Sequence, residues 1–262
     1  MTTASVERSV ERRVPPLGGF NLTLLKIELM RMLRNRRTII FTLVLPAALM
    51  LSFGGQSGWQ ERVGSGNVAA YILISMALYG AALTSAATGS MVAMERAVGW
   101  SRQLRLTPLN PVAYILTKAL VALCMGALAI VAVNVIGRIQ GKAEMPIHVW
   151  VLAMVVTLFC TLTFAALGVF IGYIVPGENA MQILGPGLAL LSFLGGLFIP
   201  LDQYASAVRD VAYWTPMYGV AEVARAPLTH ELPWYAVVNA VVWFLLFIAG
   251  AAWRMSKDTA RV

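Results

Sequence analysis

The chain has 262 residues and a net charge of +8, and it is 59% hydrophobic but only 12% charged. This charged share is about half of that typical of soluble proteins. This number of charged residues cannot cover the surface of a globule of this size. The composition therefore excludes an ordinary soluble domain.

Six windows of at least 19 residues contain no Asp, Glu, Lys or Arg. They are Thr38–Gln60, Val63–Met94, Ala119–Gly137, Met145–Gly177, Asn179–Leu201 and Leu232–Trp253. A helix needs about 20 apolar residues to cross a bilayer. The windows are apolar on every side and do not alternate at every second residue, which excludes membrane-spanning β-strands. We therefore predict an all-α polytopic membrane protein with six transmembrane helices.

Residues 1–37 are predicted to form a tail followed by an amphipathic helix. Apolar residues recur there at helical spacing at Leu22, Leu25, Leu29 and Leu33. Basic residues occupy the polar faces, namely Lys26, Arg31, Arg34 and Arg37. This pattern predicts a helix lying in the membrane interface. The alternative is a cytoplasmic extension of the first span.

Residues 38–253 are predicted to form the six-span domain, with a short tail at 254–262. The expected spans are Thr38–Gly54, Val68–Ala93, Val112–Ile136, Val149–Ile174, Ala180–Pro200 and Pro233–Trp253. The fourth holds Gly168 and Gly172 at a spacing typical of close helix contacts or dimers. The fifth is rich in Gly and Pro, which predicts either a kinked or broken helix beside a cavity or tight packing.

The basic residues are distributed unevenly between the two sides of the predicted topology. With both termini inside, the inner segments hold 15 Lys and Arg and the outer loops hold 5. Such a bias is typical of cytoplasmic segments. It predicts a multi-pass protein of the cell membrane with both termini in the cytoplasm, and it makes a nucleic-acid partner unnecessary. The basic segments also favour contact with anionic membrane lipid.

The outer segment before the last span is long and aromatic. It predicts two short re-entrant helices that are split at Thr215-Pro216 and enter the outer leaflet, where protein must shield irregular backbone. Its candidate site residues are Pro200, Tyr204, Trp214, Pro216, Tyr218 and Arg225.

The sequence offers no candidate catalytic or metal site. His148 and His230 have no ligand partner at metal-site spacing, and no ionised residue lies near the middle of a predicted span. The stretch "GRIQGKA" is one residue short of a P-loop and lacks its hydroxyl residue. We therefore predict that the chain is not an enzyme and that it does not bind ATP.

A charged segment, "ERAVGWSRQLRLTPLNP", separates the second and third predicted spans on the inner side. Its length exceeds that of a simple helix–helix turn. Residues 95–106 contain strong helix formers without proline, and a short helix of this kind fits a groove on a soluble partner. A solvated interfacial loop is the alternative. The candidate docking residues are Glu95, Arg96, Gly99, Trp100, Arg102, Leu104, Arg105, Thr107 and Pro108.

At these residues the sequence resembles the permease subunits of ABC-2 type transporters, the class that includes daunorubicin-resistance and linearmycin-resistance exporters. The matching features are Glu95-Arg96, Gly99, Leu104, Thr107-Pro108-Leu109 and Asn110-Pro111. A second likeness runs from the Gly-rich fifth span and Pro200 through Pro216 and Tyr218 to Arg225. The chain departs from the family pattern at Trp100 and at Ala97-Val98.

The resemblance implies a half-transporter of a bacterial cell membrane. Two six-span subunits, identical or different, would form the path for a hydrophobic small molecule. Separate ATPase subunits would bind ATP and Mg, so that this chain itself needs no cofactor. Residues 95–106 would be the helix that docks into the ATPase, and its Glu95 would favour the N-terminal dipole of that helix.

Three functions follow from these observations. The first is an ATP-driven exporter permease for an amphipathic drug, antibiotic or lipid-like molecule. A permease for a glycan or lipid-linked polymer is the alternative within the same class. A sensory or assembly membrane protein that docks a cytoplasmic partner is the alternative from another class.

Overall fold

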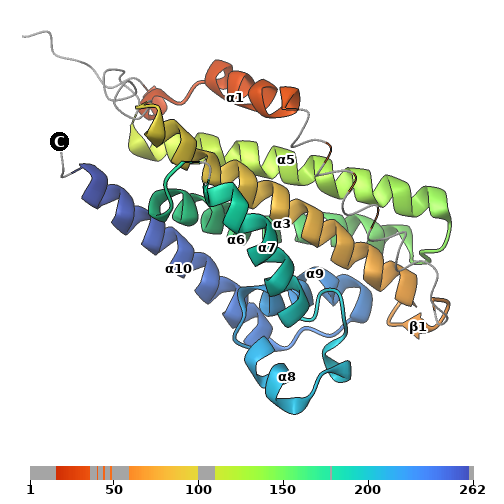
Figure 1. Ribbon diagram of the computed structural model, residues 1–262. Helices are drawn as coiled ribbons and strands as arrows, with labels where there is room; N and C mark the ends of the chain where they lie inside the picture. The colour runs from red at the N-terminus through yellow and green to blue at the C-terminus, as the bar shows by residue number, and fades with distance from the viewer. Residues whose placement is uncertain are drawn as a thin grey trace, which may run out of the picture.

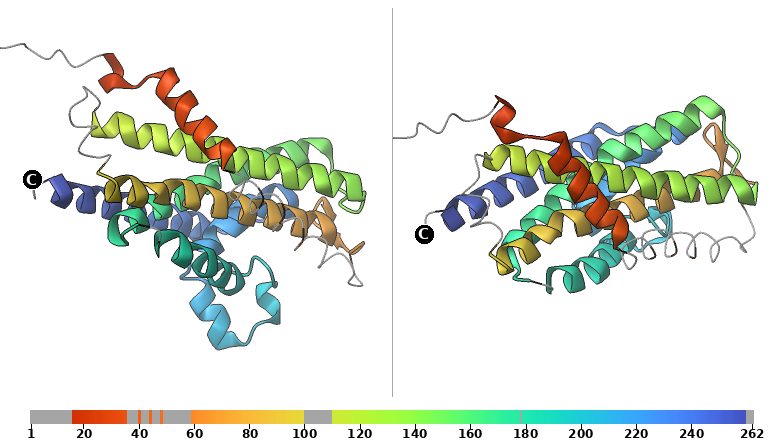
Figure 2. Two further views of the ribbon diagram at one scale, coloured as in Figure 1. Left: turned by 45° about the horizontal axis from the view of Figure 1, so that its top comes forward. Right: turned by 90° about the horizontal axis from the view of Figure 1, so that it is seen from above.

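The computed structural model describes residues 16–35, 40, 44, 48, 59–99, 110–177 and 179–259. Long helices run roughly side by side and form most of this part of the chain (Figures 1 and 2). The predicted first span, Thr38–Gly54, lies almost entirely outside the described residues.

Four helices in the described ranges are long and apolar enough to span a membrane. They are α3 (Val68–Ala97), α5 (Pro111–Gln140), α6 (Ile147–Ile174) and α10 (Trp234–Thr259). Their positions confirm the predicted second, third, fourth and sixth spans. The helix α10 extends six residues beyond Trp253, where a tail had been expected.

The remaining elements are shorter. They are η1 (Pro16–Gly19), α1 (Leu22–Arg34), α7 (Asn179–Leu194), η2 (Leu201–Gln203), α8 (Ser206–Ala212), α9 (Pro216–Thr229) and a hairpin of β1 (Arg62–Val63) with β2 (Gly66–Asn67). The helix α1 crosses α5 obliquely (Figure 2). Its Leu25, Leu29 and Met32 pack with Val121 and Met125 of α5, as expected of an amphipathic helix.

The predicted fifth span is shorter than expected. The helix α7 has 16 residues and continues through Pro186. It is about 24 Å long, less than the thickness of the hydrocarbon layer. The chain turns at Gly195 and Gly196, where Gly196 has a φ of +73°, so α7 continues through the first Gly-rich stretch and ends just before the second. A Cβ on Gly195 would lie 2.6 Å from Cβ of Met217, which accords with tight packing there.

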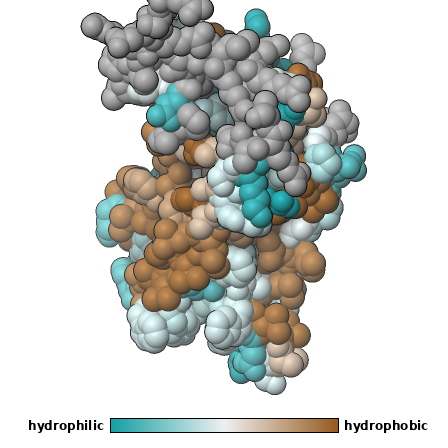
Figure 3. Space-filling view, turned by 90° about the vertical axis from the view of Figure 1, so that its left-hand side faces the viewer, coloured by the Kyte–Doolittle hydropathy of each residue, from teal (hydrophilic) through white to brown (hydrophobic). Residues whose placement is uncertain are grey.

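The helix α3 is central and α10 is peripheral. Within the most apolar 18 residues of each, 78% of the α3 residues are buried but only 17% of those in α10. Exposed valine and leucine side chains line α10, including Val241, Leu245 and Leu246. Hydrophobic residues also form broad patches in the space-filling view (Figure 3). Such surfaces are stable against lipid or against other apolar helices.

Small residues allow α3 and α6 to approach closely. A Cβ on Gly168 would lie 2.0 Å from the carbonyl oxygen of Ala86, and one on Gly89 would lie 2.4 Å from the carbonyl oxygen of Ala165. Gly172 lies against Ser90 in the same way. The glycine pair of α6 therefore makes a close helix contact within the chain.

The first and last described residues lie at the same end of the bundle (Figure 1). The carboxyl end of α3 and the start of α5 are also at this end, here called the inner end. The β1–β2 hairpin and the α5–α6 connection are at the opposite, outer end. The hairpin contacts two other segments at this end: Ser65 N–H donates to the carbonyl oxygen of Leu228 in α9 over 2.9 Å, and Asn67 Nδ2 donates to the carbonyl oxygen of Lys142 in the α5–α6 connection over 2.9 Å.

Replacing Gly168 by Ala is expected to destabilise the protein, because the new methyl group must push α3 away from α6. Overpacking of this kind costs about 1–3 kcal/mol. The thermal unfolding midpoint in detergent, followed by circular dichroism, checks this expectation. Gly187→Ala is the matched control, because a Cβ at Gly187 meets no atom within 4 Å. Equal midpoints for the two variants would contradict the close-contact interpretation.

Candidate functional site

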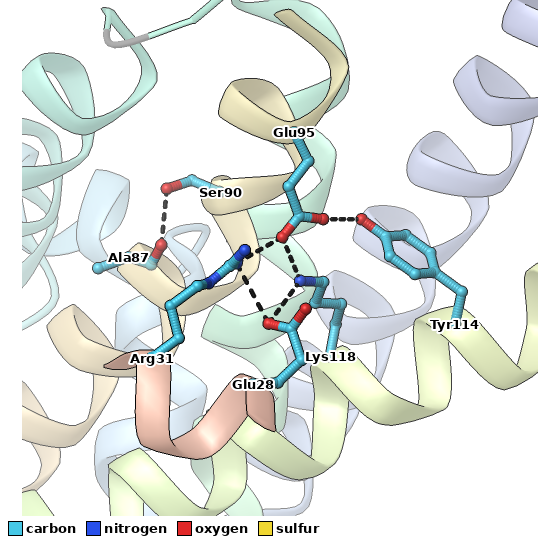
Figure 4. Close-up of polar contacts among 7 residues, drawn as sticks. All are labelled: Glu28, Arg31, Ala87, Ser90, Glu95, Tyr114 and Lys118. Atoms are coloured by element: carbon cyan, nitrogen blue, oxygen red, sulfur yellow. Dashed lines mark hydrogen bonds and ion pairs between the residues drawn. The ribbon is translucent and has the colours of Figure 1, made fainter. Parts of the chain in front are cut away.

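Five polar side chains from three helices meet at the inner end of the bundle (Figure 4). We call Glu28, Arg31, Glu95, Tyr114 and Lys118 the inner ion cluster. Glu28 and Arg31 belong to α1, Glu95 to the last turn of α3, and Tyr114 and Lys118 to the first turns of α5. The cluster therefore joins the amphipathic helix to both ends of the α3–α5 connection.

Glu95 is the centre of this cluster. Its Oε1 lies 2.5 Å from Nζ of Lys118 and 2.5 Å from Nη2 of Arg31. Its Oε2 accepts a hydrogen bond from the Tyr114 hydroxyl. Glu28 closes the network, because its Oε2 lies 3.0 Å from Lys118 Nζ and 3.1 Å from Arg31 Nη2. Each carboxylate thus shares both cations.

Helix periodicity and charge balance explain this arrangement. Glu28 and Arg31 are three residues apart and Tyr114 and Lys118 are four apart, so each pair lies on one helix face. Two acids and two bases sum to no net charge, which makes burial of Glu95 and Lys118 tolerable. Partial burial acts to lower the pKa of Arg31, but its hydrogen bond with Glu95 and the charge of Glu28 outweigh burial and raise that pKa.

The neighbouring Arg96 connects α3 to α6. Its Nη1 donates to the carbonyl oxygens of Gly172 and Tyr173 over 3.3 and 3.1 Å, and its guanidinium lies 5.1 Å from the centre of the Tyr173 ring. These carbonyls belong to the last turn of α6, where helical partners run out. A cation is favourable at this position because the carboxyl end of a helix carries partial negative charge.

Glu95 and Arg96 were predicted to begin a separate docking helix, and this boundary is wrong. Both lie within α3, which ends at Ala97, and Gly99 follows in a turn with a φ of +72°. The dipole argument for Glu95 is wrong as well, because a carboxylate at the carboxyl end of a helix opposes the dipole. Its three partners offset that penalty. Because these partners neutralise Glu95, α3 extends past its apolar stretch and Glu95 is buried in its last turn.

The other predicted docking residues lie outside the described residues. They are Trp100, Arg102, Leu104, Arg105, Thr107 and Pro108. The structure does describe where the connection leaves α3, at Val98 and Gly99, and where it returns, at Asn110. The docking role of these residues remains a prediction.

The predicted interfacial residues have different surroundings. Lys26 and Arg34 of α1 are exposed, as expected of side chains directed at water or lipid headgroups. Arg31 instead belongs to the inner ion cluster and binds Glu28 and Glu95, although 42% of its side chain remains exposed. Arg37 lies outside the described residues.

A second buried cation, Arg225 of α9, lies towards the outer end, and only 2% of its surface is exposed. Its Nε donates to Ser75 Oγ of α3 over 3.0 Å, and its guanidinium lies 4.1 Å from the centre of the Tyr71 ring. The Nη2 donates to the carbonyl oxygens of Gly196 and Leu197, over 2.9 and 3.2 Å. Arg225 therefore holds α9, α3 and the turn after α7 together.

Charge neutralisation at Arg225 comes from Glu222, whose Oε1 lies 3.5 Å from Nη1. In the predicted topology, Arg225 is one of the five basic residues of the outer loops. The structure buries it against α3 about 10 Å from the start of that helix, at 1.5 Å per residue from Val68 to Ser75. The charge-free window of α3 therefore lies beside a charge supplied by another helix.

The remaining outer candidates frame α8 and α9. Thr215 caps α9 and Pro216 is its first residue, which confirms the predicted split between two helices. Tyr218 is buried, whereas Trp214 is 80% exposed. Pro200 precedes η2, and the Tyr204 hydroxyl donates to the carbonyl oxygen of Phe193 over 2.6 Å. The six outer candidates thus have different surroundings, because Arg225 and Tyr218 are buried whereas Pro200 and Trp214 are exposed.

Sequence reasoning missed Glu28, Tyr114 and Lys118 as members of a site. Lys118 is one of the 15 basic residues of the predicted inner segments, and it follows Tyr114 by one helical turn on the same face of α5. Glu28 is an acid among basic residues on α1. Both signals were available, but neither identifies Glu95 as the shared partner, because that depends on how three helices pack.

Long apolar helices, an amphipathic inner helix and buried, charge-balanced ion pairs define a polytopic α-helical membrane protein. The ABC-2 type transporter family matches residues 21–229, which is most of the chain. The chain belongs to this family, and it is therefore a transmembrane permease component of an ABC transporter.

A curated relative agrees with this assignment. The chain is 25% identical over 243 residues to a Bacillus subtilis (strain 168) protein named "Putative transport permease YvfS". The alignment covers 89% of this chain and 96% of that protein. The similarity therefore extends over the whole permease and is not confined to one motif.

Removing Lys118 alone is expected to lower the free energy of unfolding more than removing the charges of Lys118 and Glu95 together. Among the described residues, Lys118→Met leaves two buried carboxylates with Arg31 as their remaining cation, and breaking a buried ion pair in this way costs about 3–5 kcal/mol. The double variant Lys118→Met/Glu95→Gln restores charge balance and is expected to be more stable than Lys118→Met alone. Chemical unfolding of the purified chain in detergent measures both. Additive losses would contradict the shared network.

Replacing Arg225 by Met is expected to lower the unfolding midpoint, because Ser75 Oγ and two carbonyl oxygens lose a charged donor. A hydrogen bond to a charged group contributes about 1.5–3 kcal/mol. Arg225→Lys should recover only part of the loss, since an ammonium cannot reproduce the guanidinium geometry. Arg209→Met on α8 is the control, and an equal midpoint for Arg209→Met and Arg225→Met would argue against this assignment.

Proposed function

We propose that this chain is the permease subunit of an ATP-driven exporter that moves an amphipathic drug, antibiotic or lipid-like molecule out of a bacterial cell. The observation that carries the proposal is the base of the α3–α5 connection. Both ends of that connection meet at the inner ion cluster, because Tyr114 and Lys118 of α5 bind Glu95 of α3. A firmly held base suits a segment that receives force from a partner.

The proposed orientation places the inner end in the cytoplasm. Lys26, Arg34, Arg254 and Lys257 lie on helices that reach this end, and an excess of basic residues marks cytoplasmic segments. The Bacillus subtilis relative accords with a bacterial plasma membrane. Both termini are then cytoplasmic, and exposed residues of α1 such as Leu22 and Ile27 contact lipid.

The energy source in this proposal is a separate ABC ATPase subunit, which binds ATP and Mg. Membership of the family supports such a partner. The 98–110 connection docks into it, with Trp100 and Leu104 as apolar contacts and Arg102 and Arg105 as charged contacts. This chain supplies no cofactor site in the mechanism.

The transport path in this proposal lies between two permease subunits, identical or different. Apolar residues exposed on α7, such as Ile183 and Leu190, and on α10, such as Val241, need lipid, substrate or a second subunit to cover them. Surfaces of this kind recognise a substrate by its apolar area more than by specific hydrogen bonds. An amphipathic molecule fits this chemistry better than a polar glycan.

ATP binding would draw the docked segments of two subunits together, and hydrolysis would release them. Because the segment is continuous with α3 and α5, the motion would change the angle between the permease subunits at the inner end. The outer helices α8 and α9 would then open or close the outer exit. The equilibrium between the two arrangements of the permease shifts because the ATPase binds one arrangement more tightly than the other.

Charge reversal at Arg102 and Arg105 is expected to uncouple the permease from its ATPase. The double variant Arg102→Glu/Arg105→Glu should retain normal membrane insertion but recover less ATPase when the permease is purified by affinity tag. It should also lose ATP-dependent accumulation of daunorubicin, used as a fluorescent amphipathic probe, in everted vesicles. The physical reason is repulsion where a docking contact formed.

The matched control is Arg254→Glu/Lys257→Glu, which makes the same charge change at the inner end of α10. It is expected to keep ATPase association and transport. Purification of a kinase or a synthase in place of an ATPase would overturn the proposal in favour of a sensory or assembly protein. ATPase association with no movement of any amphipathic probe would overturn the substrate class alone.

A further inference from the structure

Two consecutive residues at the end of α3 point to different neighbours. Successive side chains on an α-helix are separated by about 100°, so Glu95 and Arg96 leave the helix in different directions. Glu95 binds Arg31 of α1 and Lys118 of α5. Arg96 binds the carbonyl oxygens of Gly172 and Tyr173 at the end of α6. The pair thus links α3 to three other helices within one turn.

The Glu95 side of this junction fixes both ends of the α3–α5 connection. Tyr114 lies in the first turn of α5 and donates to Glu95, so the start of α5 is held to the end of α3. A further contact anchors the returning end, because Asn110 N–H donates to the carbonyl oxygen of Gly18 over 2.8 Å. The two ends of the connection therefore have a common base that also includes α1.

Arg96 supplies the α6 side of the junction. It is only partly buried. In α6 it contacts two carbonyl oxygens and the Tyr173 ring. The geometric effect of these contacts is to fix the end of α6 against the end of α3, immediately before the α6–α7 turn.

We propose that Glu95 and Arg96 are a pair of positioning residues that make the inner ends of α1, α3, α5 and α6 one rigid junction. Rotation of the α3–α5 connection then moves α1 through Glu95 and the α6–α7 turn through Arg96. The pair acts inside the permease and does not contact the ATPase. The role in coupling rests on the proposed function, whereas the rigid junction is a property of this chain alone.

Distances measured by double electron–electron resonance test the junction without any partner. In a Cys124→Ser/Cys160→Ala background, one spin-label pair joins Ile27 of α1 to Val135 of α5. A second pair joins Ile174 of α6 to the same Val135. All three positions are exposed or at a helix end, and the full chain is measured in lipid nanodiscs.

The two variants are expected to give opposite patterns. Glu95→Gln should broaden the Ile27–Val135 distances and leave the Ile174–Val135 distances narrow. Arg96→Gln should broaden the Ile174–Val135 distances and leave the Ile27–Val135 distances narrow. Arg96→Lys should restore narrow Ile174–Val135 distances, because an ammonium also donates to carbonyl oxygens. Lys26→Gln, an exposed site on α1, is the control and should change neither pair.

Coupling is then measured on the complex with its ATPase. Both variants should keep ATPase association and hydrolysis, while daunorubicin transported per ATP hydrolysed falls about fivefold or more, as expected for loss of a coupling free energy of 1 kcal/mol or above. A residue that only stabilises the fold would lower hydrolysis and transport together.

Narrow distances in both variants would overturn the inference, and so would broadening of both pairs by either variant. An unchanged ratio of transport to hydrolysis would overturn the role in coupling. If no ATPase associates with the wild-type chain, the proposed function fails, while the resonance distances still decide whether the junction exists.

Discussion

Buried charges must be neutralised by partners at short distance, and this constraint organises both ends of the bundle. At the inner end, Glu95 is stable in the last turn of α3 because Arg31 and Lys118 lie within 2.5 Å of it. Towards the outer end, Arg225 is stable because hydroxyl and carbonyl oxygens and Glu222 surround it. Each group thereby fixes elements that hydrophobic packing alone leaves free to slide, since apolar contacts have little directional preference.

Between these two sites, α3 supplies the geometric reference for the molecule. Its small residues let α6 approach until Gly168 lies against the backbone of Ala86. Close packing of this kind restricts sliding and rotation of the two helices. The inner ion cluster and the Arg225 contacts lie near opposite ends of the same helix. The two sites are therefore connected by one continuous helix, α3.

The two charged sites differ in the elements that they connect. The inner ion cluster joins helices to the base of the segment that we propose to dock an ATPase. Arg225 joins α9 to the turn after α7, where Gly196 and Leu197 provide acceptors. In the proposed mechanism one part of the permease receives force and another controls the exit, and the two charged sites lie towards opposite ends of α3.

Much of the architecture follows from sequence because hydropathy is a local property. The charge-free windows placed α3, α5, α6 and α10 to within a few residues of their apolar segments, since any long apolar helix must be buried or face lipid. The split before Pro216 was also predictable, because proline is favoured in the first turn of a helix. The extent of α3 was not, because Glu95 and Arg96 look like surface residues until their partners are known.

The sequence by itself determined that this is a helical membrane permease with an amphipathic helix and a charged inner connection, because composition, periodicity and motif order are written along the chain. Only the tertiary structure decided what the charged residues do. Arg31 and Glu95 are 64 residues apart and Arg225 and Ser75 are 150 apart. Their pairing depends on the angles and separations at which helices pack. Three-dimensional contact therefore assigned Glu95 and Arg225 to the interior and Arg96 to the end of α6, where the linear pattern had assigned all three to surfaces.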